Sequence, residues 1–110
     1  MAKFSEEMIQ EIWVTHGVVV PGFDPALWRK DYVGAWIRRD MYGQEGDYGW
    51  QIDHLRPLSH GGSDDLANLY PLQWRNNISK SNNFPEFSSV VAASGNTNTD
   101  NHQRWRINQN

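Results

Sequence analysis

An aspartate followed directly by a histidine, Asp53 and His54, is the residue pair in this chain best suited to chemistry. The pair ends a segment, Trp50 to His54, that we expect to be an extended strand, in which neighbouring side chains point to opposite faces. A carboxylate oxygen suits a hard divalent cation such as Mg²⁺, and an imidazole can take a proton from water near neutral pH. The pair therefore predicts a metal ligand, Asp53, beside a general base, His54.

Hydrolysis of a phosphodiester is one reaction that such a pair can perform. It needs an activated water, neutralised charge on the phosphoryl oxygens and a stabilised leaving alkoxide, and one bound metal supplies the last two. Asn77 is the candidate second ligand through its amide oxygen, because we expect it on one face of a helix from Pro71 to Lys80. The residues thus predict one divalent ion held by two protein groups and several waters. Mg²⁺ is the expected ion, and Mn²⁺ is the alternative.

The chemical residues form an ordered pattern over residues 49–82. In chain order the pattern consists of Asp53–His54, Gly61–Gly62, Asn68, Asn77 and Lys80. This order resembles that of the HNH endonuclease family, and hydrophobic residues are spaced between the polar positions as a folded core requires. Taken one by one, the same residues are ordinary turn or surface residues, so the prediction depends on their combination.

The resemblance implies a fold and a role for each matching residue. The fold would be a small ββα-metal core, in which Asp53 and Asn77 bind the metal, His54 activates water and Asn68 supports the loop between them. The activity would be endonucleolytic hydrolysis that leaves 5′-phosphate and 3′-hydroxyl ends. DNA is the expected substrate, with RNA as the alternative.

The chain departs from many members of that family because it contains no cysteine. Those members bind a structural zinc with two CxxC pairs, which would fall near Ala35 and Arg38 and near Gln73 and Asn76. A zinc site on cysteine is therefore excluded. We expect packed tryptophans to stabilise the region instead, since a buried aromatic removes about 150–250 Å² from water. The four candidates are Trp28, Trp36, Trp50 and Trp74.

The charge of the chain is unusual for a protein that binds a polyanion. The net charge is −3, although acidic and basic residues are equal in number over residues 25–110. We expect Arg56 and Lys80, which flank the site in sequence, to contact phosphates. Four basic residues before the motif form either a basic rim that contacts nucleic acid or a solvated face: Arg29, Lys30, Arg38 and Arg39. Weak DNA affinity at physiological salt follows from this balance.

The remaining sequence predicts an α+β fold in a single domain, with the ββα core joined to an N-terminal helix and a flexible C-terminal tail. Ser5 followed by two glutamates predicts a helix that ends near His16. A short helix over residues 25–30 and a strand over residues 34–39 are expected before the core.

We place the domain at residues 1–87 and the flexible tail at residues 88–110, which are rich in Ser, Asn and Thr. Trp105 in that segment either stacks on a base or docks back on the domain. A segment long and apolar enough to cross a membrane is missing from the sequence, as is the apolar core of a signal peptide, so a cytoplasmic location is expected. The sequence leaves the oligomeric state open.

Two other classes of protein are compatible with the same residues. A non-catalytic nucleic-acid-binding module could keep the ββα frame without turnover, and the acidic balance favours it. A protein-interaction domain built on the tryptophans would bind no metal. Titration with Mg²⁺ or Mn²⁺ separates this last class from the others.

Overall fold

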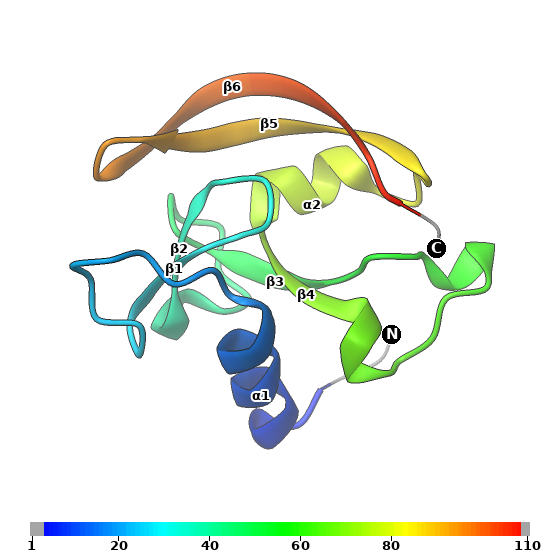
Figure 1. Ribbon diagram of the computed structural model, residues 1–110, viewed down its shortest axis with the longest axis horizontal. Helices are drawn as coiled ribbons and strands as arrows, with labels where there is room; N and C mark the ends of the chain where they lie inside the picture. The colour runs from blue at the N-terminus through cyan, green and yellow to red at the C-terminus, as the bar shows by residue number, and fades with distance from the viewer. Residues whose placement is uncertain (1–3, 109–110) are drawn as a thin grey trace.

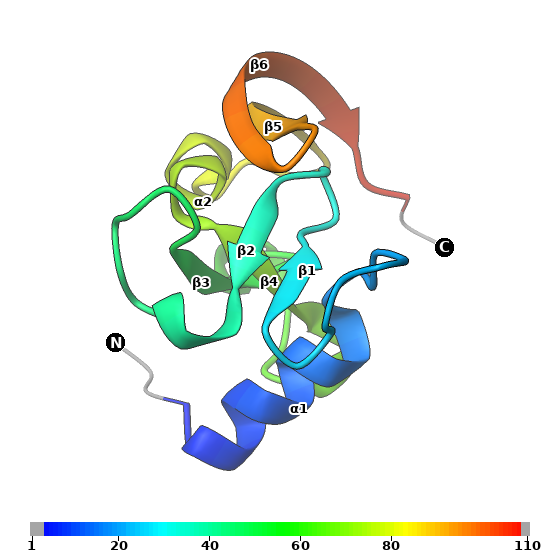
Figure 2. The same ribbon diagram turned by 90° about the vertical axis from the view of Figure 1, so that its left-hand side faces the viewer.

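The computed structural model describes residues 4–108, which form two helices and three two-stranded antiparallel sheets. In Figure 1 the hairpin β5–β6 arches over α2, β3 and β4 lie in the middle, and α1 lies on the opposite side; Figure 2 shows β1 and β2 beside this stack. The predicted α+β class is confirmed. No helix in residues 4–108 has the length and apolar character needed to span a membrane. The bounds are α1 (Glu6–His16), β1 (Trp28–Lys30), β2 (Trp36–Arg38), β3 (Trp50–His54), β4 (Leu69–Gln73), α2 (Trp74–Lys80), β5 (Glu86–Ser94) and β6 (Thr97–Arg106).

The predicted N-terminal helix is confirmed as α1. The Ser5 hydroxyl accepts a hydrogen bond from the Met8 amide at 3.1 Å, which satisfies one of the free N–H groups of the first turn. The helix ends at Gly17, where an added Cβ would lie 2.6 Å from both the Arg29 side chain and the Trp13 carbonyl. Its inner face buries Trp13 completely.

Asp53 and His54 both lie at the end of β3, and pairing with β4 holds this strand in place. The two strands run antiparallel, with Asp53 opposite Tyr70 and His54 opposite Leu69. The start of β3 is anchored by Trp50, which is fully buried against Trp13 of α1 with ring centroids 5.4 Å apart. Burial of such a residue contributes on the order of 2–3 kcal/mol, so the sheet is fixed at the end away from the site.

The helix α2 begins three residues later than the sequence predicts. Pro71 lies in β4, opposite Ile52, and not in the first turn of the helix. The helix starts instead after Gln73, whose side-chain oxygen accepts hydrogen bonds from the amides of Arg75 at 2.8 Å and Asn76 at 3.2 Å. A glutamine at this position is an uncommon cap, and for that reason the sequence pattern did not indicate it.

The prediction of a flexible tail over residues 88–110 is wrong for the residues up to Arg106. Residues 86–94 and 97–106 form a hairpin whose first strand packs along α2. Phe87, Ser89 and Val91 alternate on the buried face of β5, whereas the Asn- and Thr-rich residues of β6 face solvent. The polar composition of this segment therefore masked the alternation of buried and less buried residues that is typical of a strand.

Trp105 docks back on the domain. Its side chain is half-buried, packs against the cluster formed by Val33, Leu72 and Phe87, and donates a hydrogen bond from Nε1 to the Ser89 hydroxyl at 2.8 Å. This contact decides between the two alternatives for Trp105 in favour of the structural one.

The short helix expected over residues 25–30 is also wrong. Asp24 does cap a turn, accepting from the Ala26 amide at 3.0 Å, but the turn does not continue. The chain enters β1 at Trp28, and Arg29 pairs with Ile37 of β2. Pairing with β2 outweighs the local helical signal, and the strand expected over residues 34–39 is confirmed as β2.

A buried carboxylate, that of Asp31, joins the two segments in which the sequence analysis expected the CxxC pairs of many HNH endonucleases to fall. Asp31 is 1 % exposed and accepts hydrogen bonds from the amides of Ala35 at 2.8 Å and Gln73 at 2.9 Å, and from the Asn76 side chain at 3.3 Å. Asn76 in turn accepts from the Val91 amide at 2.9 Å. Hydrogen bonds accepted by Asp31 thus join α2, β4 and the segment before β2, and Asn76 extends this network to β5.

The expectation that tryptophans do this work is correct only in part. Trp36 and Trp50 are buried, whereas Trp28 and Trp74 are half-buried. Three of the four residues at the expected cysteine positions, Ala35, Gln73 and Asn76, are instead hydrogen-bonded to Asp31, which the sequence analysis did not single out. A carboxylate accepts from several donors at once, so it can join chain segments much as a metal ion does.

The pH dependence of stability should show the ionisation of Asp31. Burial raises the pKa of Asp31 from 3.8 to about 6, despite the hydrogen bonds that lower it. Because the folded-state pKa lies above the unfolded one, the stabilising contribution is complete below about pH 4 and is lost as the pH rises through about 6. Over this range we expect the free energy of unfolding to fall by on the order of 3 kcal/mol.

Asp31→Asn is the matched variant, measured by urea unfolding at several pH values from 4 to 7. The variant should be less stable overall, because its NH₂ group faces the Gln73 amide, but it should lack this part of the pH slope. Asp53, whose pKa is also raised, contributes equally to both proteins. Identical slopes in parent and variant would show that Asp31 does not titrate in this range.

Candidate active site

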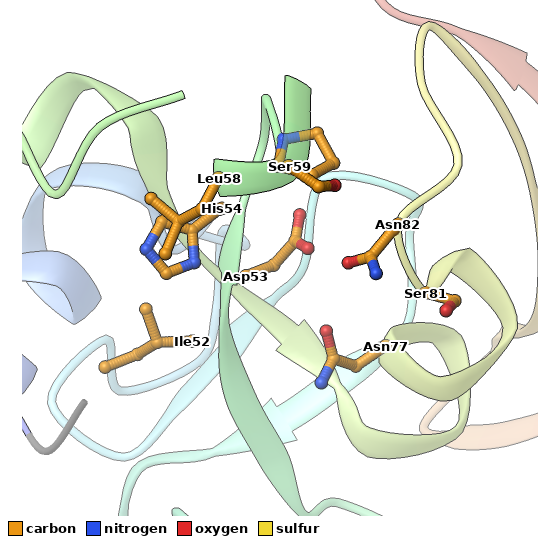
Figure 3. A pocket seen from close by; sticks show the side chains of 9 residues that line it. Ile52, Asp53, His54, Leu58, Ser59, Asn77, Ser81 and Asn82 are labelled. Carbon is orange, nitrogen blue, oxygen red and sulfur yellow. The ribbon is translucent and has the colours of Figure 1, made fainter. Parts of the chain in front are cut away.

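A cavity of about 480 Å³ lies between the end of β3 and the C-terminal end of α2. Figure 3 shows side chains from both elements and from the following turn around it. The lining residues are Ile52, Asp53, His54, Pro57, Leu58, Ser59, Asn77, Ser81 and Asn82. The fold therefore brings three of the four predicted catalytic and metal-binding residues to one cavity, namely Asp53, His54 and Asn77.

Asp53 is nearly buried, with 5 % of its surface exposed. Its Oδ2 accepts a hydrogen bond from the Tyr32 hydroxyl at 2.7 Å, and its Oδ1 lies 3.2 Å from the Lys80 ammonium. Burial raises the pKa of Asp53, and the positive charge of Lys80 opposes this effect. A carboxylate has about four acceptor positions, so two remain for a ligand in the cavity toward which the side chain points in Figure 3.

Tyr32 holds one side of this carboxylate as a permanent donor. Burial, followed by the negative charge of Asp53, raises the pKa of Tyr32 far above its ordinary value. The phenol therefore stays protonated and fixes the orientation of Asp53 through its hydroxyl.

Lys80 holds the other side, which corrects the expectation that it contacts phosphates. The side chain is fully buried, and its ammonium donates to Asp53 and to the backbone carbonyl of His54 at 3.0 Å. A buried ammonium with these partners is not available to a phosphate on the surface. Its position one helical turn after Asn76, which is also buried, is the sequence signal that could have indicated an inward face.

His54 lies on the opposite side of the strand from Asp53, with 20 % of its side chain exposed. Its Nε2 lies 2.6 Å from Oδ1 of Asp64, a residue that the sequence analysis did not identify. The ring also borders a second, more apolar hollow of about 640 Å³, which shares Ile52, Leu58 and Asn77 with the first. His54 thus stands where the two hollows meet.

Asn68 lies outside the cavity and connects the two ends of the loop that follows β3. Its side-chain oxygen accepts from the Arg56 amide at 2.8 Å, and its NH₂ group donates to the carbonyls of Arg56 at 3.0 Å and Ser63 at 2.8 Å. Gly62 allows this close approach, because a Cβ there would lie 1.7 Å from the Arg56 carbonyl oxygen. Asn68 therefore acts on the site only through the loop.

Asn77 and Asn82 add amide groups to the cavity beside Asp53 (Figure 3). Asn82 is a second residue that the sequence analysis missed; its place just past α2 gave no distinct signal. Within residues 4–108, no cluster of three or more His, Cys, Asp or Glu side chains could hold a metal ion. One carboxylate with amide oxygens is a donor set that fits a hard, largely hydrated ion such as Mg²⁺ better than a transition metal.

The other predicted nucleic-acid contacts differ in their availability. Arg56 is exposed, although its Nε donates to the His60 carbonyl at 2.8 Å. Arg38 lies 2.8 Å from Asp40, and Arg39 lies 2.9 Å from Glu6. Acidic partners thus offset the charge of the expected basic rim, which leaves Arg56 as the better candidate.

Comparison with known proteins adds one finding to this geometry. Residues 41–83 match the model of the family described as HNH endonuclease. The matched segment contains β3, β4, α2 and every residue that the sequence analysis assigned to the metal and the base. Searches of the curated proteins and of the solved structures gave no match.

Proposed function

We propose that the chain, whose residues 41–83 match the HNH endonuclease family and which contains no cysteine, is a divalent-metal-dependent endonuclease acting on DNA. The observation that carries the proposal is the cavity in which Asp53, His54 and Asn77 meet. It combines an oxygen donor set for a metal with a base on the adjacent residue.

Each residue has a separate task in this mechanism. His54 accepts the proton of the attacking water through an imidazole nitrogen. Asp53 and Asn77 would hold the metal, which when bound neutralises charge on the phosphoryl oxygens and on the leaving alkoxide. Tyr32 and Lys80 keep the Asp53 carboxylate in one orientation, so that its free acceptor positions face the cavity.

The charge distribution determines how the substrate is held. With a net charge of −3, and with Arg38 and Arg39 paired to acids, few free cations remain within residues 4–108 to attract a polyanion. Binding would then depend on Arg56 and on the charge of the metal, so affinity should be low and should fall only gradually with salt, because few phosphates are neutralised. Mg²⁺ is the proposed ion.

Cleavage of supercoiled plasmid with Mg²⁺, with Mn²⁺ and with EDTA tests the proposal. Nicking that requires metal and stops in EDTA is the expected result. Absence of nicking with either metal would refute it. An RNA of similar length in the same assay distinguishes the two substrates.

A non-catalytic nucleic-acid-binding module is the second candidate. The observation that favours it is the Lys80–Asp53 pair, because an ammonium 3.2 Å from the carboxylate competes with a metal for the same charge. Such a module would bind DNA without metal and would leave plasmid intact.

Asn77→Ala should weaken metal binding without unfolding the protein. Asn77 is half-buried at the cavity and supplies one of the two proposed ligands, so we expect the dissociation constant for Mn²⁺ to rise by about tenfold or more. Isothermal titration calorimetry measures this constant directly. Asn101→Ala, an exposed asparagine on β6, is the control and should bind Mn²⁺ like the parent. Equal affinity in the parent and Asn77→Ala would remove Asn77 from the metal site.

A further inference from the structure

The contact between His54 and Asp64 joins the proposed base to a carboxylate from the loop between β3 and β4. The Nε2 atom of His54 lies 2.6 Å from Oδ1 of Asp64. This is a short, charge-assisted hydrogen-bond distance. It is made although the Asp64 side chain is 62 % exposed and has water available as a partner.

The chemistry of the two groups fixes where the proton lies. An ionised carboxylate only accepts hydrogen bonds, so Nε2 of His54 must carry the hydrogen and donate it. In a neutral ring the other nitrogen, Nδ1, is then the acceptor. Within residues 4–108, Nδ1 of His54 makes no hydrogen bond to the protein. Nδ1 is therefore free to accept a proton from water.

Hydrogen bonds within the loop fix the position of Asp64. The residue before it, Ser63, is held by the Asn68 side chain at 2.8 Å, and the residue after it donates its amide to the Ser63 hydroxyl at 3.2 Å. Asn68 also fixes Arg56, two residues after His54. One asparagine thus sets the separation between the histidine and its carboxylate.

We propose that Asp64 is the positioning residue for His54, which it holds with the hydrogen on Nε2 and with Nδ1 turned to the attacking water. This inference rests on the proposed function for its catalytic part. It also gives the hydrogen bonds of Asn68 a role, because without them the loop would no longer hold Asp64 beside the imidazole ring of His54. Asp64 itself does not touch the substrate.

The ring nitrogens of His54 can be observed directly by NMR in metal-free, ¹⁵N-labelled protein at pH 8. We expect the parent to show one tautomer, protonated on Nε2, and the Asp64→Ala variant to show signals averaged between the two tautomers. Asp65→Ala removes the same charge from the neighbouring exposed residue and should keep the parent signals. Parent-like signals in Asp64→Ala would overturn the proposal.

Cleavage supplies the second readout. Loss of Asp64 should lower the nicking rate at saturating DNA by about 10- to 100-fold, the range found for groups that orient the ligands of a metal site, while the affinity for DNA changes little. Asp64→Glu, which keeps the carboxylate, should recover part of the rate, and Asp65→Ala should match the parent. An active parent with an equally active Asp64→Ala would refute the positioning role.

The two proposals fail in different ways. A parent that does not nick plasmid refutes the nuclease, whereas the ring signals still show whether Asp64 holds His54. Because the Asp64 side chain is exposed, its removal should leave the midpoint of urea unfolding unchanged. A large shift of that midpoint would instead mark Asp64 as a residue of the fold.

Discussion

His54→Ala should reduce metal-dependent nicking of plasmid by about 10²- to 10⁴-fold, the usual contribution of a general base. The variant removes the imidazole from the meeting point of the two hollows but leaves Asp53, Tyr32 and Lys80 in place. Metal affinity should therefore stay near that of the parent. Initial rates at saturating Mg²⁺ and calorimetric Mn²⁺ binding measure the two quantities on the same preparation.

His102→Ala is the matched control for this substitution. His102 is an exposed residue of β6 and is not among the residues that line either hollow, so its removal should change neither the rate nor the stability. Nicking by His54→Ala at the parent rate would show that another group activates the water. Loss of activity in both histidine variants would point to a general effect on the protein and not to the base.

Lys80→Met should lower the free energy of unfolding by about 3–5 kcal/mol at pH 7, because it leaves the Asp53 carboxylate buried without its counter-charge. The methionine keeps most of the volume, so the loss reports the charge and not a cavity. Since burial raises the pKa of Asp53, the carboxyl should take up a proton at lower pH, and the difference from the parent should shrink there. Urea unfolding at pH 5 and pH 7 measures both effects.

Two further variants distinguish the effect of breaking the Lys80–Asp53 ion pair from the effect of replacing the lysine side chain. The double variant Lys80→Met with Asp53→Asn should recover part of the lost stability, because no buried charge is left unpaired. Arg75→Met on the same helix breaks an exposed ion pair with Asp100 and should cost about 1 kcal/mol or less. If Lys80→Met and Arg75→Met had equal effects, the ion pair between Lys80 and Asp53 would not support the fold.

The sequence predicted the parts of the fold that are governed by local signals. Ser5, the two glutamates and the spacing of hydrophobic residues indicate α1, and the strand before Asp53 is indicated by its short apolar pattern. The helix at 25–30 and the tail at 88–110 were wrong because pairing with the next strand along the chain decided each segment. The propensity of single residues does not contain the energy of such cross-strand contacts.

The site divides in the same way. Residue types and their order sufficed to select Asp53, His54 and Asn77, since metal binding and proton transfer require particular functional groups, and all three line one cavity. Their assigned roles stay predictions. The partners Tyr32 and Asp64 come from other segments, 21 and 10 residues away in sequence from the groups that they contact.

What the sequence by itself determined is therefore which groups are available for chemistry and which family residues 41–83 resemble. The tertiary structure alone decided that Lys80 is buried against Asp53 and that Asp64 reaches His54. It also decided that Asp31 joins the segments of Ala35 and Gln73. The physical reason is that the energy of a charge depends on its surroundings. A lysine or aspartate reads as a surface residue in sequence, and only folding shows whether it lies in water or beside an opposite charge in the interior.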